Sequence, residues 1–288
     1  MAYTIATAFD ELKSNLEPTA LQKETLSTRQ QKVRDSVAAG LDVLEDFLVG
    51  SYVRKTMIGP MKEADIDIFI VLHPKYFKAD GQSALLERVK TALIKTYSTN
   101  PKIRKNGQAV TITFTDFKVD VVPAFNRQGG GYLIPDVNKA KWIETNPKVH
   151  LDLVQKENTA QSGKFIPLVK MIKGWNRNIN YAFIGFRLEL LLLDKYKPLL
   201  IGDSYANAVT SVFNTGREAI KNMANDPAGY SGVISGLDNA TDVNDAVSRF
   251  QTAYSLALKA NEYEAQDQLV YAFSCWKKIF GDNFPTYG

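Results

Sequence analysis

The stretch Leu48–Leu72, LVGSYVRKTMIGPMKEADIDIFIVL, contains two aspartates at the start of an apolar segment. In its last eight residues, DIDIFIVL, isoleucine occupies every second position from 66 to 70, which is typical of a β-strand. Successive side chains of a strand point to opposite faces, so Asp65 and Asp67 project to the same side. The stretch therefore predicts a central strand that carries two neighbouring carboxylates.

Two carboxylates on one face repel each other unless water surrounds them, a proton is shared or cations lie between their oxygens. The apolar strand argues against a plain solvent face, and oxygen ligands without Cys or His favour Mg²⁺ or Mn²⁺ over zinc. Two such ions about 3.5–4 Å apart form the usual centre for phosphoryl or nucleotidyl transfer. The alternative is structural: Asp65 marks a turn and Asp67 an exposed strand end.

A third carboxylate is expected on a second strand, Phe117–Phe125, whose sequence FKVDVVPAF alternates in the same way. Phe117, Val119 and Val121 share one face, and Asp120 lies on the other. Asp120 is therefore the leading candidate to complete the acidic site. Pro123 is expected to limit how far this strand continues.

Gly50 and Ser51 precede the aspartates, with Ser51 14 residues before Asp65. A Gly-Ser turn can offer backbone N–H groups and a hydroxyl to phosphate oxygens beside a metal site. The alternative is that Gly50 ends a preceding helix as its C-terminal cap, and both roles can coexist.

The first half of the chain mixes helices and strands. A long amphipathic helix is expected from the N-cap at Thr19 to Phe47, and a second helix from Ser83 to Tyr97. Asn106-Gly107 lies between two extended segments and predicts a hairpin.

Beyond about Lys148 the strand signals stop, and helical periodicity takes over in 165–176, 186–199, 204–223, 243–260 and 265–280. We therefore divide the chain into a catalytic lobe, residues 1–147, which includes the N-terminal helix, and a helical lobe, residues 148–288. A ligand cleft is expected between them.

Composition excludes several classes of protein. The 288 residues carry a formal charge of +4, too mild and dispersed for a nucleic-acid surface. The single cysteine, Cys275, with only His73 and His150 beside it, cannot build a Cys/His zinc site. Neither a membrane span nor a signal peptide is evident, so we expect a cytoplasmic protein without a membrane partner.

A Gly-Ser turn, a D-x-D strand and a later lone Asp together resemble the DNA polymerase β-type nucleotidyltransferases. Further blocks resemble one branch of that superfamily, the bacterial cGAS/DncV-like nucleotidyltransferases, or CD-NTases: GSYVRKT, FKVDVVPAF, LVKMIKGWN and AFSCWKKIFGDNFP. The resemblance implies an α+β fold, in which a polymerase β-like lobe of mixed sheet and helices, with a long N-terminal helix, is joined to a C-terminal helical lobe.

The resemblance also implies roles for the acidic residues and the turn. Asp65 and Asp67 would bind two Mg²⁺ or Mn²⁺ ions, and Asp120 would hold the ion that activates the attacking ribose hydroxyl. Gly50 and Ser51 would hold the donor triphosphate.

The resemblance also implies basic residues that bind the phosphates of the substrate. Lys173 matches the family's phosphate-binding lysine, Lys170 lies one helical turn before it, and Arg54 follows the Gly-Ser turn. Each has a structural alternative as a solvated or packing side chain. The chain departs from the family at Gly185, where members commonly have serine, and Arg187 or nearby backbone N–H groups could replace the missing hydroxyl contact.

The segment between the two lobes, which follows Asn126, should shape the base pockets. Three of its residues are candidate base contacts: Tyr132, Asp136 and Trp142.

The implied activity is synthesis of a cyclic di- or trinucleotide from nucleoside triphosphates, ATP or GTP first, with release of pyrophosphate. Such products act in antiphage (CBASS-type) signalling through a downstream effector. A partner that conjugates the C-terminus, Gly288, is also considered. Direct activation by double-stranded DNA is not expected, because the chain lacks a zinc-capable insertion.

Two other functions stay open. The first is a transferase that adds nucleotides to RNA, a protein or a small molecule. The second is a non-catalytic nucleotide- or RNA-binding sensor.

Overall fold

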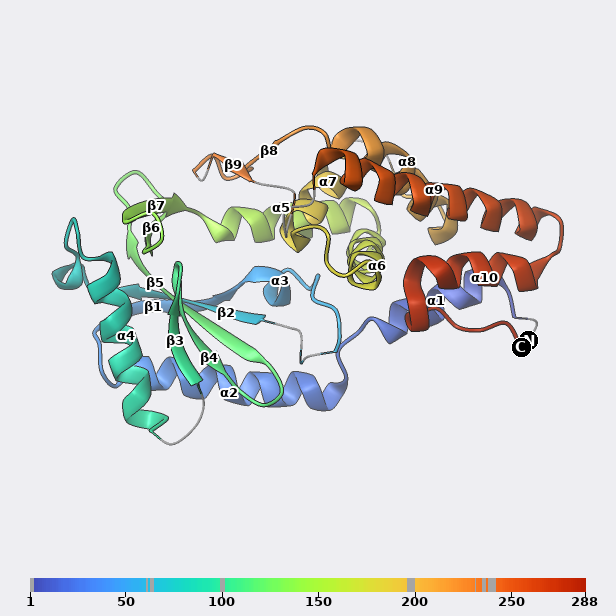
Figure 1. Cartoon of the computed structure of the whole chain (residues 1–288). Coiled ribbons are helices and arrows are strands. Elements are labelled where there is room, and N and C mark those ends of the chain that lie inside the picture. The colour runs from blue at the N-terminus through green and yellow to red at the C-terminus, as the bar shows by residue number, and fades with distance from the viewer. Residues whose placement is uncertain are drawn as a thin grey trace. The chain divides into compact units, whose positions relative to one another are not determined.

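The structure, a computed structural model, describes residues 3–60, 62, 65–98, 102–195, 200–230, 232–234, 237 and 242–288. It divides into two compact units (Figure 1). The sheet unit comprises Pro18–Asp152 and Asp226–Gly232, and the helical unit comprises Met1–Glu17, Leu153–Asn225 and Val233–Gly288. The fold is α+β, as predicted. Across the described residues, no helix is long and apolar enough to cross a membrane.

One mixed sheet organises the sheet unit, with its strands in the order β1-β2-β5-β4-β3 and with β6 paired to β5 and β7. The β2–β5 pair is parallel and the other pairs are antiparallel. The strands are β1 (Val43–Val49), β2 (Asp65–Leu72), β3 (Lys102–Asn106), β4 (Ala109–Thr113), β5 (Lys118–Asn126), β6 (Tyr132–Asp136) and β7 (Lys141–Thr145). The predicted D-x-D strand therefore lies inside the sheet, and the Asn106-Gly107 hairpin is confirmed.

Two helices, α2 (Ala20–Ala38) and α4 (Gln82–Thr96), cover one face of this sheet. Their apolar residues join the isoleucines of β2 and Val119 and Val121 of β5 in one buried cluster. The predicted N-cap is confirmed, because the Thr19 side chain accepts from the Gln22 N–H and the Gln22 side chain accepts from the Thr19 N–H. This cluster holds the strands that carry the acidic residues.

The predicted extension of the first helix to Phe47 is wrong. The helix ends at Ala38, shortly before Gly40, and β1 begins at Val43. Phe47 packs against Phe69 and Tyr132, and its ring centroid lies 5.2 Å from that of Phe69 and 5.7 Å from that of Tyr132. Pairing with β2 and this aromatic packing override the local helical pattern.

The expectation that Pro123 limits its strand is also wrong, since β5 runs on to Asn126 and Pro123 pairs with Ile70 of β2. The neighbouring β4 pairs with β5 only as far as Val121. Pro123 therefore lies beyond the β4 ladder, where an N–H group is not needed for pairing with β4. The strands β6 and β7, which follow, were not predicted as strands.

The helical unit contains most of the remaining helices, and the division between the units falls within α5. The predicted helices of the second half are present, but the one predicted for 204–223 ends at Ala219 and the one predicted for 265–280 begins at Leu269. Residues 196–199 lie outside the described part, and α1 and α5 are additional. The elements are α1 (Ile5–Asn15), α5 (Pro147–Ala160), α6 (Phe165–Asn178), α7 (Gly185–Lys195), α8 (Tyr205–Ala219), α9 (Val243–Ala265), α10 (Leu269–Phe280) and the short strands β8 (Ala224–Asn225) and β9 (Val233–Ile234).

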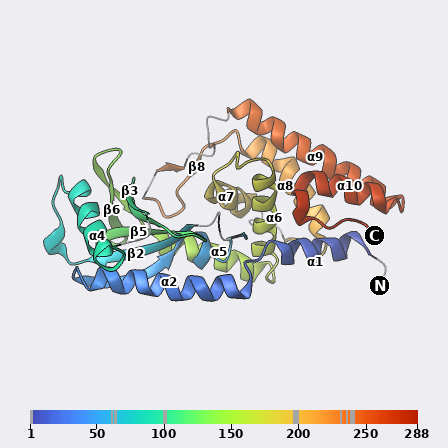
Figure 2. The same cartoon turned by 60° about the horizontal axis from the view of Figure 1, so that its bottom comes forward.

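The N-terminal helix α1 belongs to the helical unit, whereas the sequence assigned residues 1–17 to the catalytic lobe. Figure 2 shows α1 beside α10. Phe9 contacts Trp276, Phe280 and Phe284 edge-on, with ring centroids 4.9, 6.0 and 5.4 Å away. This aromatic cluster joins the two ends of the chain, which explains the difference.

We predict that Phe9→Ala lowers the free energy of unfolding of the helical unit by about 3–5 kcal/mol, because Phe9 is 1% exposed and its loss leaves a cavity. Urea unfolding followed by tryptophan fluorescence measures this change, since Trp175 and Trp276 both lie in this unit. The control is Val270→Ala on α10, 60% exposed, which should change stability by no more than about 0.5 kcal/mol. Equal effects of the two variants would contradict the docking of α1.

Candidate active site

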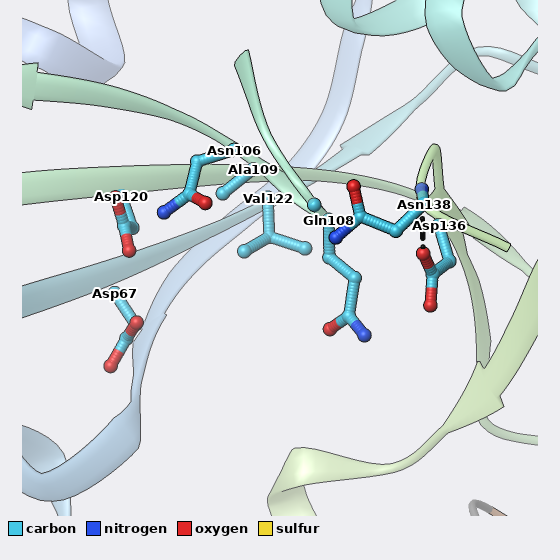
Figure 3. Close-up of a pocket in the computed structure, with 9 residues that line it drawn as sticks. Asp67, Asn106, Gln108, Ala109, Asp120, Val122, Asp136 and Asn138 are labelled. Carbon is cyan, nitrogen blue, oxygen red and sulfur yellow. Dashed lines mark hydrogen bonds between the residues drawn. The ribbon is translucent and has the colours of Figure 1, made fainter. Parts of the chain in front are cut away.

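The acidic residues of β2 and β5 come together through the register of the parallel pair. Asp67 lies directly opposite Asp120, and Asp65 lies opposite Lys118. Figure 3 shows the Asp67 and Asp120 carboxylates on the same side of adjacent strands. The residues that directly precede them on each strand, Ile66 and Val119, are fully buried on the opposite face. The sequence predicted a pair of Asp65 and Asp67 with Asp120 as the third acid, whereas the strand register pairs Asp67 with Asp120.

Burial and mutual repulsion disfavour the charged forms of both carboxyl groups. Burial, followed by the charges of Asp120 and Asp65, raises the pKa of Asp67 from 3.8 to about 7, while Arg54 acts in the opposite direction. Burial also raises the pKa of Asp120, and the neighbouring Thr111 hydroxyl partly opposes this change. The fold therefore holds two anionic groups where a cation would stabilise them.

One oxygen of this pair has no internal partner. Asp120 Oδ1 is buried and accepts no hydrogen bond from any described residue. A buried acceptor without a donor is costly in a native protein and calls for an external ligand. Carboxylate oxygens are the ligands that Mg²⁺ and Mn²⁺ prefer, so the donor set fits such an ion.

Asp65 is more exposed than this pair, although its charge acts on both Asp67 and Asp120. Its side chain is 50% exposed, and its Oδ1 lies 3.7 Å from Lys118 Nζ. Within the described ranges, no group of three acidic, His or Cys side chains converges closely enough to hold a metal unaided. The structure therefore brings Asp67 and Asp120 together and leaves Asp65 at the edge of the site.

Gly50 lies against the Asp67 carboxylate. It follows β1 and begins the short helix α3 (Gly50–Val53), with φ of +72°. A Cβ added at Gly50 would lie 1.9 Å from Asp67 Oδ2, so any side chain here would displace the carboxylate. Because a strand precedes Gly50, the alternative of a helix C-cap is wrong.

The turn around Ser51 is tied to the residues that follow it. The Ser51 carbonyl accepts hydrogen bonds from the Thr56 N–H at 2.9 Å and the Met57 N–H at 3.1 Å. Arg54 lies in the same turn, is 8% exposed, and is close enough to Asp67 to favour its charged form. Gly50, Ser51 and Arg54 therefore accompany the carboxylates in the sheet unit.

The two lysines lie on α6, in the helical unit, and both form ion pairs. Lys173 Nζ is 2.6 Å from Glu189 Oε1, and the Glu189 side chain is fully buried. Lys170 pairs with Glu17. Their sequence spacing on one helix face gave no sign of these acidic partners, which come from α7 and from the segment after α1.

Gly185, where the chain departs from the family pattern, begins α7 beside Lys173. A Cβ at Gly185 would lie 3.8 Å from Lys173 Nζ. The guanidinium of Arg187 is engaged elsewhere, donating to the carbonyls of Ala219 at 3.1 Å and Asn222 at 2.8 Å. Arg187 therefore secures the chain after α8 through one nitrogen of its guanidinium.

The three candidate base contacts that follow Asn126 all make contacts with other residues of the sheet unit. Tyr132 packs on Phe47 and Phe69, and the Trp142 indole donates to the carbonyls of Lys78 and Ala79. Asp136 Oδ1 accepts two backbone N–H groups of its own turn, although Asp136 also borders a pocket beside the carboxylates.

Sequence reasoning missed that pocket, which has a volume of about 270 Å³. It is lined by Asp67, Asn106, Gly107, Gln108, Ala109, Asp120, Val122, Asp136 and Asn138. The Asn106-Gly107 signal indicated only a hairpin. No local signal could reveal that the β3–β4 turn meets the β6–β7 turn, where the Val137 N–H donates to the Gly107 carbonyl at 3.1 Å.

Comparison with known proteins identifies the family. The model of the Second Messenger Oligonucleotide or Dinucleotide Synthetase domain matches residues 3–158, more than half of the chain.

The sequence identity between this chain and individual relatives is low. A probable cyclic nucleotide synthase of Bacillus cereus is 27% identical over 83% of this chain and 81% of its own length. A cyclic AMP-AMP-AMP synthase of an Acinetobacter species is 25% identical over 96% of this chain and 84% of its own.

The fold is similar to that of Escherichia coli CdnC, solved with ATP, with a TM-score of 0.78 at 15% identity over 97% of this chain and 98% of that one. The matches confirm the predicted family and fold class. The chain belongs to the second messenger oligonucleotide or dinucleotide synthetase family of bacterial CD-NTases, and it is a nucleotidyltransferase of the cyclic oligonucleotide synthase class.

Proposed function

We propose that this enzyme joins nucleoside triphosphates into a cyclic di- or trinucleotide at the Asp67–Asp120 pair. ATP is the first candidate substrate, because one relative is named for a product of three AMP units and the E. coli protein was solved with ATP. The product would serve as a second messenger for a downstream effector in antiphage signalling.

The observation that carries this proposal is the Asp67–Asp120 pair, with its buried Asp120 oxygen and the glycine backbone packed against Asp67. Asp67 and Asp120, with Asp65 at the edge, would hold two Mg²⁺ or Mn²⁺ ions. Bound there, such ions supply charge neutralisation for the phosphates and lower the pKa of a bound hydroxyl.

The residues of the chain then have defined tasks in the transfer. A bond forms from the attacking ribose oxygen to the α-phosphorus, and the bond from that phosphorus to the bridging oxygen breaks, releasing pyrophosphate. Asp120, which borders the pocket beside the pair, is proposed to accept the proton of the attacking hydroxyl.

Gly50 and Ser51 are proposed to hold the triphosphate, with Arg54 beside them. Gly50 leaves the Asp67 carboxylate in place, because any side chain there would overlap it. In the helical unit, Lys173 is proposed to bind phosphate while Glu189 orients its amine. Lys170, already paired with Glu17, is the weaker candidate.

The direct test incubates the protein with all four nucleoside triphosphates and Mg²⁺ or Mn²⁺, treats the mixture with phosphatase and identifies the surviving product by mass spectrometry. A phosphatase-resistant cyclic product is expected. Linear extension of added RNA would instead support the tailing alternative, and nucleotide binding without turnover would support the sensor alternative.

We predict that Asp67→Asn and Asp120→Asn each lower the rate of product formation at least about a hundredfold, because each removes an anionic ligand at the reacting groups. Triphosphate binding should persist in Asp120→Asn. The matched control is Asp80→Asn, an exposed acid of the same unit, which should keep the wild-type rate. Full activity of Asp120→Asn would remove this residue from the site.

A second prediction concerns Gly50→Ala. The variant should lose at least about tenfold in rate, because the added methyl must displace the Asp67 carboxylate. Gly163→Ala is the control, since Gly163 also has a positive φ, +82°, but a Cβ there meets nothing within 4 Å. Both variants should lose about 1–2 kcal/mol of stability through backbone strain, measured by urea unfolding. Equal rates in the two variants would show that Gly50 matters only for backbone conformation.

A further inference from the structure

A second pocket lies between α10 and the segment that follows it. After α10 the chain turns at residues 281–283 and runs back along that helix (Figure 1). The pocket has a volume of about 370 Å³, within the range of about 300–1,000 Å³ that is usual for small-molecule sites. It belongs to the helical unit, whereas Asp67 and Asp120 belong to the sheet unit. The pocket is therefore separate from the catalytic pair.

One wall of this pocket is a single stripe of α10. Its lining residues are 270, 273, 274, 277 and 278, whose spacing of three and four places them on one face of the helix. The stripe begins with Val270 and Phe273 and ends with Lys277 and Lys278. The pocket is therefore apolar toward the start of α10 and cationic toward its end.

The opposite wall, residues 285–287, is held in place by the residues before it and by Phe273. The Asn283 carbonyl accepts a hydrogen bond from the Asn15 side chain at 3.0 Å. Phe284 is fully buried, and its ring centroid lies 5.7 Å from that of Phe273. The Tyr287 ring meets Phe273 edge-on at 5.1 Å. Because the wall exists before a ligand arrives, binding costs less ordering entropy.

The two lysines give the pocket a positive end without a counter-charge. Lys277 Nζ donates to Thr286 Oγ1 at 2.8 Å, which leaves two of its three N–H groups for a ligand. Lys278 is exposed. No carboxylate lines the pocket, and no acid in the described part of the chain forms an ion pair with either lysine. Two neighbouring cations of this kind favour an anionic ligand.

The other lining groups favour a ligand whose body is apolar. Apart from the two lysines, the polar side chains of the lining carry only the hydroxyls of Ser274, Thr286 and Tyr287. A nucleobase needs partners for several donors and acceptors at its edges, and the lining holds no carboxamide, carboxylate or guanidinium to supply them.

We propose that this pocket binds a small organic anion, an apolar body that carries one carboxylate or phosphate. The body packs against Val270, Phe273 and Tyr287, and the anionic group binds Lys277 and Lys278. Such a ligand contacts both α10 and the segment that runs back along it. Its binding therefore stabilises the folded helical unit.

The test uses two fluorescent probes of nearly the same shape. 8-Anilinonaphthalene-1-sulfonate carries one negative charge on an aromatic body, and N-phenyl-1-naphthylamine is the same body without the charge. The double variant Lys277→Gln/Lys278→Gln should weaken binding of the sulfonate about tenfold and change that of the neutral probe less than about twofold. The variant Lys277→Arg/Lys278→Arg keeps both charges and should retain the affinity for the sulfonate. The control is Lys156→Gln, an exposed lysine of the same unit outside the lining.

A third variant tests the apolar wall. Tyr287→Ala should weaken both probes by about the same factor, because it removes apolar contact area and no charge. Urea unfolding confirms that each variant is folded, which is expected because Tyr287 is 40% exposed. Equal weakening of the two probes by Lys277→Gln/Lys278→Gln would overturn the anion assignment. The pocket itself would be ruled out if the wild-type protein failed to bind the sulfonate saturably, or if the glutamine and Tyr287 variants all kept its affinity. Neither measurement depends on turnover.

Discussion

The alignment of Asp67 with Asp120 across the parallel strands β2 and β5 is the constraint on which the site depends. A shift of one residue in this pairing would turn one carboxylate into the apolar cluster beneath the sheet. The isoleucines of β2, together with Val119 and Val121 of β5, prevent that shift, because they are fully buried on the other face. Burial of these apolar side chains therefore offsets the repulsion between the two carboxylates.

Several parts of this arrangement could be predicted from the sequence because they depend on local patterns. Alternation in residues 65–72 and 117–125 correctly assigned Asp65, Asp67 and Asp120 to the polar faces of two strands. The N-cap at Thr19 and the Asn106-Gly107 hairpin also follow from short-range chemistry. What the pattern could not supply was the pairing register, which places Asp67 opposite Asp120 and Asp65 opposite Lys118.

Other features depend on contacts between distant segments, and the predictions made for them from the sequence differ from the structure. Residues 43–47 continue a helical pattern but form part of β1. They pair with β2, and Phe47 packs against Phe69. Phe9 docks on aromatic residues some 270 positions later, so α1 joins the helical unit. The pocket beside the carboxylates likewise depends on two turns that meet only in the folded chain.

The two lysines that the resemblance implied as phosphate ligands illustrate the same limit. Their spacing on α6 suggested phosphate binding for Lys173 and Lys170, but not the acids that each one contacts. A lysine held by a buried glutamate has a fixed amine, which gives Glu189 a positioning role toward Lys173. Gly185 opens the space beside that amine, where the family commonly has a serine.

The central claim is that the fold holds Asp67 and Asp120 as a pair that requires a cation. The most direct measurement is the pKa of the Asp67 carboxyl, followed by ¹³C NMR titration with and without Mg²⁺. Without the ion the pKa should lie near 7, because burial and the neighbouring carboxylates disfavour the charged form. With Mg²⁺ it should fall well below that value, since the ion binds only the deprotonated group. A pKa near the ordinary 3.8 that does not respond to Mg²⁺ would contradict the account.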